Sequence, residues 1–251
     1  MKAVGAALPI LVWLLAGLMS AAAQSRERIG ELSYLEGELA VSRNGRALSS
    51  QEVDIGLEIQ NLDLLKTARS GYAELTVDAP RAPASVIKIS PNTIFYVELN
   101  TVGKDKRTTV GAITGSVALK VQKLGANQQV NVTTEAVVMA VRGTVFEVTL
   151  TPSGDLLLSI SEGRVLVQEE KGRELAVEPG EALEQLAGEP PRRIPVAVSS
   201  LEQFRRDWYA ERLEVFKANP LKAIRFYALR YRALRERFLR AYAALQSEKA
   251  I

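Results

Sequence analysis

The sequence predicts a mainly β protein, in which an all-β domain is followed by a C-terminal α-helical hairpin. Three observations lead to this prediction. Residues 28–186 alternate Val, Ile, Leu and Thr with polar residues over short runs. Gly, Asn, Asp and Pro separate these runs, as turn-forming residues do. After Ser200, the apolar residues instead recur with helical spacing.

Ten short strands are expected in the β region, with tight hairpin turns at Arg43–Leu48 and Pro152–Asp155. The expected strands are ELAVSR, YAELTVD, SVIKIS, TIFYVELN, SVALKVQ, QVNVTT, VVMAV, TVFEVTL, LLLSIS and RVLVQEE. No convincing helical pattern separates them, so a sandwich, a roll or a short β-solenoid would each satisfy the spacing.

Several strand-like runs begin just after a glycine, and one of them is out of step with the rest. The glycines are Gly37, Gly71, Gly115, Gly143 and Gly163. After four of them, apolar residues stand two and four positions later, but after Gly143 they stand at odd offsets, at Phe146 and Val148. A strand changes its buried face only when an extra residue is inserted, so we expect a bulge or bend at Gly143. Arg142 and Glu147 should then point away from the core.

The same region resembles a known family. The run VNVTTEAVVMAVRGTVFEVTL, followed by ISEGRVLVQ and LAVEPGEAL, is similar to the FecR domain of bacterial envelope proteins. The motif positions are Arg142, Gly143, Thr144, Phe146, Val148, Glu162 and Gly163. The resemblance spans residues 62–187 and implies an extracytoplasmic, non-enzymatic, all-β domain used for protein contacts. One interpretation of the motif is structural, in which these residues form a bend. The alternative is that Arg142, exposed beside the bend, contacts a partner.

The N-terminus predicts export. Lys2, an apolar run from Leu8 to Met19 and small residues up to Ala23 indicate a signal peptide over residues 1–23. An uncleaved membrane anchor is the alternative, because the apolar segment is almost long enough to cross a bilayer. We therefore expect a periplasmic protein, associated peripherally with the membrane or wall. In the family's namesake regulators a cytoplasmic tail binds a sigma factor. Here only Met1 and Lys2 precede the mainly apolar segment that starts at Ala3, so we expect a free-standing relative.

The composition disfavours most enzymes. The chain has no Cys and no His, which removes Ser-His and Cys-His nucleophile pairs and zinc sites built from these residues. We predict no catalytic, cofactor-binding or metal-binding residues. A cell-wall hydrolase that uses paired carboxylates remains an alternative.

The C-terminal region is predicted to fold separately from the β domain, which we assign to residues 24–187. Residues 188–199 are rich in proline and predict a linker, or a strap across the β domain. Ser200 and Gln203 predict a capping box for a helix from Leu201 to Ala218. Asn219-Pro220 should end that helix, and a second one should run to Ser247 as the other arm of the hairpin in residues 200–251.

The second helix combines an apolar seam with many arginines. The seam contains Ile224, Tyr227, Tyr231, Leu234, Phe238, Ala241 and Leu245. The candidate anion or partner contacts are Arg225, Arg230, Arg232, Arg235, Arg237 and Arg240. Residues 201–251 carry a net charge of +6, against −4 for residues 26–200. Export disfavours nucleic acid, which leaves anionic lipid or wall polymer, a solvated arginine face, or a homo-oligomer interface.

These features together predict a non-enzymatic periplasmic binding or scaffold module. It would recognise an envelope protein or polymer through its β domain and use the basic helices for docking or oligomerisation. A membrane-anchored signalling regulator with an uncleaved signal is the alternative function.

Overall fold

The computed structural model describes residues 27–80, 82–102, 105–122, 128–134, 137–141, 143–169 and 174–221, and residues 224, 225, 228, 232 and 236. Among them it has 17 strands, a short 3-10 helix (η1, Val198–Ser200) and one complete α-helix (α1, Leu201–Ala218). The mainly β fold class is therefore confirmed. No helix in this part of the chain has the length and hydropathy needed to cross a membrane.

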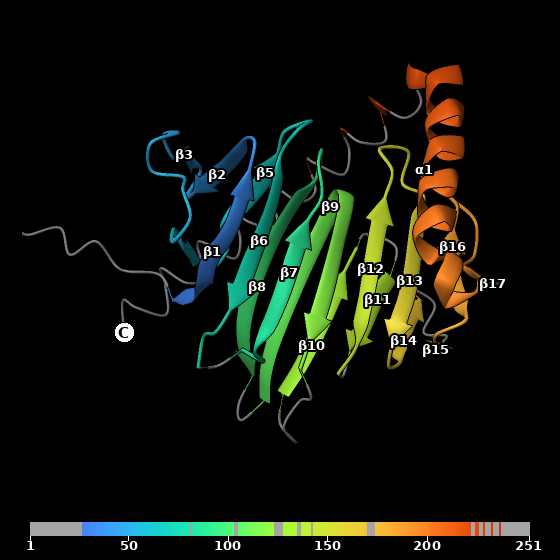
Figure 1. The fold of residues 1–251 in the computed structure, drawn as a ribbon, viewed down its shortest axis with the longest axis horizontal. Coiled ribbons are helices and arrows are strands. Elements are labelled where there is room, and N and C mark those ends of the chain that lie inside the picture. Colours follow the sequence, from blue (N-terminus) through green and yellow to red (C-terminus); the bar gives the residue numbers. More distant parts are fainter. Residues whose placement is uncertain are drawn as a thin grey trace, which may run out of the picture.

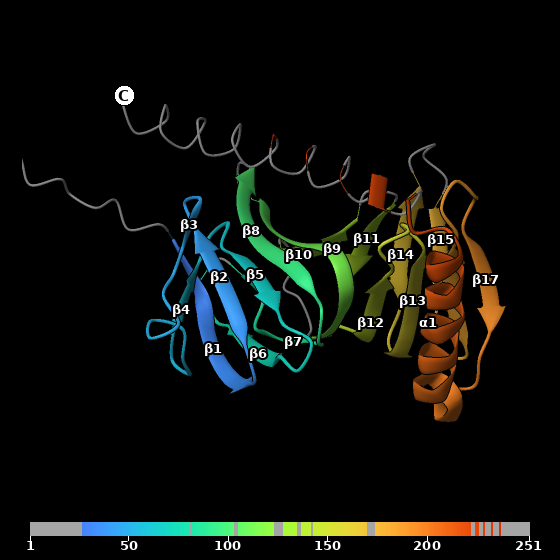
Figure 2. The same cartoon turned by 90° about the horizontal axis from the view of Figure 1, so that it is seen from above.

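The strands form two layers, which we call sheet A and sheet B (Figures 1 and 2). In order across sheet A lie β4 (Glu58–Gln60), β1 (Arg28–Glu36), β6 (Tyr72–Val77), β7 (Ser85–Ile89), the second half of β9 (Asp105–Val121), β12 (Val145–Leu150), β13 (Leu156–Glu162), β16 (Glu181–Gln185) and β17 (Arg192–Pro195). In order across sheet B lie β3 (Arg46–Ala47), β2 (Leu39–Arg43), β5 (Leu64–Thr67), β8 (Ile94–Val102), the first half of β9, β10 (Gln128–Thr133), β11 (Val137–Val141), β14 (Val165–Glu169) and β15 (Glu174–Val177).

Strand β9 joins the two layers into one hydrogen-bonded network. Its first half pairs with β8 and β10, and its second half pairs with β7 and β12. The change of sheet occurs at Gly115, where φ is +90°. A Cβ there would lie 2.4 Å from Thr93 Cα, so only glycine fits this bend. All pairings are antiparallel except the one between β9 and β10.

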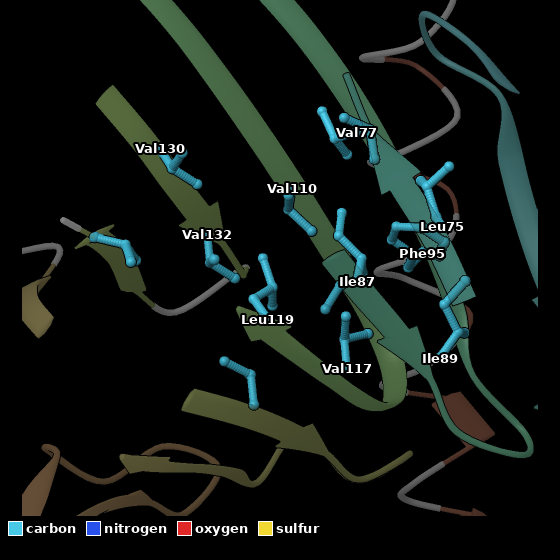
Figure 3. Packing of buried hydrophobic residues seen from close by; sticks show 14 of the residues in the cluster. Leu75, Val77, Ile87, Ile89, Phe95, Val110, Val117, Leu119, Val130 and Val132 are labelled. Carbon is cyan, nitrogen blue, oxygen red and sulfur yellow. The ribbon is translucent and has the colours of Figure 1, made fainter. Parts of the chain in front are cut away.

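The core lies between the layers and is apolar (Figure 3). Phe95 and Val110 of sheet B face Ile87 and Leu119 of sheet A, and all four are at most 1% exposed. Because burial of one such large side chain contributes about 1.5–3 kcal/mol, this continuous core can hold the two layers together without disulfides.

The glycines that precede the predicted strands lie where the chain crosses between layers. Crossings lie at Gly37 (β1 to β2), Gly71 (β5 to β6), Gly115 (within β9), Gly143 (β11 to β12) and Gly163 (β13 to β14), and another lies at Gly180 (β15 to β16). The chain also changes layer between β3 and β4, between β4 and β5, and between β7 and β8. The apolar residues after these glycines are buried as expected, because each crossing restarts the alternation.

All ten expected strands are present, and seven more were not expected: β1, β3, β4, β5, β15, β16 and β17. The longest of these, β1, shifts register between Arg28 and Gly30 and again between Leu32 and Tyr34. Each shift interrupts the strict alternation by which a strand is recognised in sequence.

The C-terminal region differs from the prediction in three respects. The helical hairpin is not confirmed, because only α1 is complete and most of the second predicted helix lies outside the described residues. Ser200 makes no capping hydrogen bond, because it is the last residue of η1, which runs directly into α1. The predicted linker contains a strand, β17, that pairs with β16 at the edge of sheet A.

Candidate binding surface

The family motif builds the crossing from sheet B to sheet A. Strand β11 ends at Val141 and β12 begins at Val145, with Gly143 at φ +64° between them. Thr144 is 1% exposed and lies within this crossing, between the buried side chains of Val141 and Phe146, which have opposite parity. The bend predicted at Gly143 is therefore present. Arg142 lies outside the described residues, so its outward orientation stays a prediction.

The other motif residues have structural positions. Phe146 and Val148 are buried in the core, as predicted. Gly163 has φ +83°, and a Cβ there would lie 2.6 Å from Thr144 Cγ2, so the two crossings pack directly against each other. Glu162 is exposed beside them.

Glu147, which the parity argument expected to face outward, lies on the outer face of sheet A and contacts α1. The Ser116 hydroxyl donates to its Oε1 at 2.5 Å. Arg205 of α1 places Nε 3.4 Å from Glu147 Oε2, and its Nη1 donates to Ser159 Oγ at 2.9 Å. The bend at Gly143 thus orients a carboxylate toward the C-terminal helix.

A second buried carboxylate fixes the same helix. Glu184 of β16 is 4% exposed. Its Oε1 accepts a hydrogen bond from Trp208 Nε1 at 2.7 Å, and its Oε2 accepts one from Arg192 Nε at 2.6 Å. Trp208 also packs with Leu157 and Leu201 in a small apolar cluster outside the main core. Helix α1 therefore covers the β13–β16 part of sheet A.

The remaining outer face of sheet A carries a group of aromatic and charged residues, which we call the tyrosine surface: Tyr34, Tyr72, Glu74 and Lys88. The two rings meet edge to face, with centroids 5.8 Å apart. Tyr72 Oη donates to Glu74 Oε1 at 2.7 Å, and Lys88 Nζ lies 3.0 Å from the same oxygen. Tyr34 remains 44% exposed. The side chains are thus preordered and yet accessible.

The hydrogen bonds at this surface shift two pKa values in opposite directions. The Tyr72 hydroxyl, and then Lys88, hold the pKa of Glu74 below its usual value. Burial, and then the carboxylate of Glu74, raise the pKa of Tyr72. Glu74 therefore stays ionised, whereas a general acid in glycoside hydrolysis needs a raised pKa. The described residues also contain no cluster of acids suited to a metal ion. The lowered pKa of Glu74 thus differs from that of a general acid.

Strand register connects the tyrosine surface to α1. Glu74 pairs with Lys88, Lys88 with Ala118, and Ala118 with Glu147. These residues form one row across the outer face of sheet A, ending where Arg205 contacts Glu147. A molecule bound over this row would reach from the tyrosines to the helix.

The predicted arginine contacts are only partly described. Arg225 and Arg232 are exposed, and Arg232 Nε lies 3.6 Å from Glu236 Oε1. Arg230, Arg235, Arg237 and Arg240 lie outside the described residues. Their role toward anions therefore stays a prediction.

Comparison with known proteins identifies the central part of the chain. The family model described as FecR protein matches residues 63–166. Residues 63–166 are a FecR domain. This FecR domain runs from β5 into β14 and contains β9, the crossing at Gly143 and the outward carboxylate of Glu147. The edge strands β1–β4 and β15–β17, and α1, lie outside it.

Two crystal structures of a "putative anti-sigma factor" from Parabacteroides distasonis are also similar to this FecR-domain chain. The first has 12% identity and a TM-score of 0.47 over 56% of this chain and 63% of that protein. The second has 13% identity and a TM-score of 0.46 over 55% of this chain and 62% of that protein. The chain thus spans less than two thirds of their length. No curated protein matches the chain.

The tyrosine surface was not predicted from the sequence. The alternation in YAELTV does place Tyr72 and Glu74 on the polar side of β6, which is a usable signal. Tyr34 lies in the irregular strand β1, and Arg205 reaches Glu147 only through the docking of α1. No local sequence pattern predicts the contact of Tyr34 with Tyr72 or the contact of Arg205 with Glu147.

Proposed function

We propose that this FecR-domain protein is a non-enzymatic, exported signalling module that recognises an envelope protein through the tyrosine surface. The observation that supports the proposal most directly is the open part of sheet A. There, Tyr34 is 44% exposed beside the ordered pair of Tyr72 and Glu74. Tyrosine is enriched at protein interfaces because it provides a large apolar contact together with a hydrogen-bonding hydroxyl.

Helix α1 makes this surface suitable for signalling. Its Arg205 contacts the last residue of the row that begins at the tyrosine surface, so a partner on sheet A would touch both elements. Displacement of Arg205 would leave Glu147 with its Ser116 hydrogen bond alone. Binding at the tyrosine surface would then alter how firmly the C-terminal region is held.

The test is crosslinking in the native envelope, followed by identification of the captured molecule. Wild-type protein is compared with a Tyr34→Ala, Tyr72→Ala double variant. The matched control is Ile55→Ala, which truncates a 59% exposed apolar residue in the turn region between β3 and β4. We expect the double variant to lose the crosslinked product at least tenfold, and the control to retain it. Equal capture by all three proteins would show that the tyrosine surface is not the recognition site.

A polymer is the second candidate ligand, because exposed tyrosines and hydrogen-bonding carboxylates also suit a glycan. The same crosslinking experiment distinguishes a polymer ligand from a protein partner. A protein partner gives a crosslinked band of discrete mass that protease removes, whereas a wall polymer gives a heterogeneous product that a glycan hydrolase removes.

A further inference from the structure

The outer face of sheet B is unusually apolar for a surface. Ile94 and Tyr96 of β8 and Ile113 of β9 point away from the core, because the residues between them point into it. They are nevertheless only 3–7% exposed and form a separate cluster. Val138 and Leu166 extend this face onto β11 and β14. A face of this kind needs a covering element.

Helix α1 does not cover it. The contacts of α1 are with β12, β13, β16 and β17 on the outer face of sheet A. The described residues that follow α1 are coloured red in Figure 2, and they lie beyond sheet B on the side away from sheet A. The few described residues after Asn219 therefore lie on the opposite outer face of the sandwich from α1.

Five described residues of this last segment are helical. Four of them lie on one side, and Ile224, at the flank of that side, is 55% exposed. Arg225, Ala228, Arg232 and Glu236 are spaced by three or four positions, and all four are exposed. At 100° per residue, the opposite side contains Tyr227, Leu234, Phe238, Ala241 and Leu245, together with one arginine, Arg230. In a continuous helix, this mainly apolar side would lie opposite the solvent-exposed stripe.

The length of the segment matches the width of the sheet. A helix over the roughly 30 residues after Pro220 is about 45 Å long at about 1.5 Å per residue. Nine strands at about 4.8 Å spacing span about 38 Å. One continuous helix can therefore cross sheet B from β15 to β3.

A buried polar atom on the same face also lacks a partner. Asn131 of β10 is 8% exposed, and its Oδ1 accepts no hydrogen bond from the described residues. Asn131 pairs with Thr109 and Ala140 in the middle of sheet B. A donor on a covering helix would satisfy this oxygen, as buried polar atoms require.

We propose that residues 222–247 form an amphipathic strap that covers the outer face of sheet B, in place of a hairpin with α1. The apolar side of the strap packs on Ile94, Tyr96 and Ile113. Arg225 and Arg232 remain on its outer side, where they can contact anions of the envelope. The strap is independent of the function proposed for the tyrosine surface on sheet A.

Engineered disulfides test the strap cleanly, because the full chain contains no cysteine. Ala140→Cys on the outer face of β11 is combined in turn with Tyr227→Cys, Tyr231→Cys and Leu234→Cys. We expect at least one pair to oxidise to an intramolecular disulfide, seen as a monomer of increased gel mobility. Two control pairs, Ala140→Cys with Arg232→Cys and Lys88→Cys with Tyr227→Cys, should crosslink at least tenfold less. Retained circular dichroism confirms folding.

Three outcomes would overturn the proposal. Equal crosslinking in the control pairs would mean that the segment has no defined orientation on sheet B. A second outcome is a disulfide in the Val215→Cys, Tyr227→Cys variant and none in the Ala140→Cys, Tyr227→Cys variant. That result would support a hairpin between α1 and the last segment. Crosslinked dimers would assign the face to a second copy of the chain.

A labelling experiment gives an independent measurement. Ile113→Cys, at a position that is 6% exposed, should react slowly with a soluble thiol reagent in the otherwise wild-type chain. Adding Leu234→Asp with Phe238→Asp should detach the strap and raise this rate at least tenfold, whereas Arg232→Asp should leave it unchanged. An unchanged rate in the double aspartate variant would contradict the strap.

Discussion

At the scale of single residues, the glycines of the family motif have a steric role that can be measured. Gly163 and Gly180 both have positive φ and both lie at crossings between layers. A Cβ at Gly163 would lie 2.7 Å from Gly143 O, whereas one at Gly180 meets nothing within 4 Å. The positive φ costs roughly 1–2 kcal/mol for alanine, and overlap adds roughly 1–3 kcal/mol. We therefore expect Gly163→Ala to lower the free energy of unfolding by about 2–5 kcal/mol and Gly180→Ala by about 1–2 kcal/mol. Urea denaturation measures both, and equal losses would contradict the packing of the two crossings.

The carboxylate of Glu74 gives a pH-dependent prediction. Its pKa is lowered first by the Tyr72 hydroxyl and then by Lys88. A lowered pKa in the folded state means that the contact stabilises the protein above the ordinary carboxyl pKa, and that this stabilisation is lost as the pH falls through the lowered value. Tyr72→Phe should raise the pKa of Glu74 toward its ordinary value and reduce this dependence. NMR titration of the side-chain carboxyl carbon measures the shift. Tyr34→Phe is the control, because Tyr34 makes no hydrogen bond to Glu74 among the described contacts.

At the scale of elements, α1 is held by few but buried contacts. Trp208 is 5% exposed and donates to Glu184. We expect Trp208→Ala to destabilise the protein by about 3–5 kcal/mol, because it leaves both a cavity and a buried carboxylate with one donor fewer. Arg206→Ala is the control on the same helix. Its ion pair with Glu202 is exposed, so the expected change is about 0–1 kcal/mol. Thermal unfolding followed by circular dichroism distinguishes the two.

The elements also show what sequence patterns can and cannot predict. YAELTV was predictable, because one side of β6 is buried and the other is not. The bend at Gly143 was also predictable, because a change in the parity of the apolar residues is a local signal. The strand β17 was not, because it is four residues long and its pairing with β16 depends on the rest of sheet A. The tyrosine surface required the register of β1 against β6, which two irregularities in β1 conceal.

At the scale of the whole molecule, the charge difference between the two regions predicts salt-dependent binding. The six tail arginines should bring the protein to vesicles that contain anionic lipid at low ionic strength. Binding should weaken with salt, because the screening length falls from about 30 Å at 0.01 M to about 8 Å at 0.15 M. Replacing all six by Gln should abolish co-sedimentation, and replacing them by Lys should preserve most of it. Binding that survives the Gln replacement would assign the attraction to another surface.

The N-terminal prediction has its own measurement. If residues 1–23 are a cleaved signal peptide, the exported protein starts at Gln24, and N-terminal sequencing of protein from the periplasmic fraction will show this. An intact N-terminus in the membrane fraction would instead support the anchored regulator.

Strand β9 has a mechanical consequence. Among the described residues, every ladder between the first eight strands and the last eight runs through β9, which pairs with β7 and β8 on one side and with β10 and β12 on the other. A force that pulls the two ends of the chain apart must therefore load this one strand. The sandwich should yield in a single step when β9 shears from its neighbours. Force spectroscopy would record that step as one dominant rupture peak, with the two halves extending together only after it.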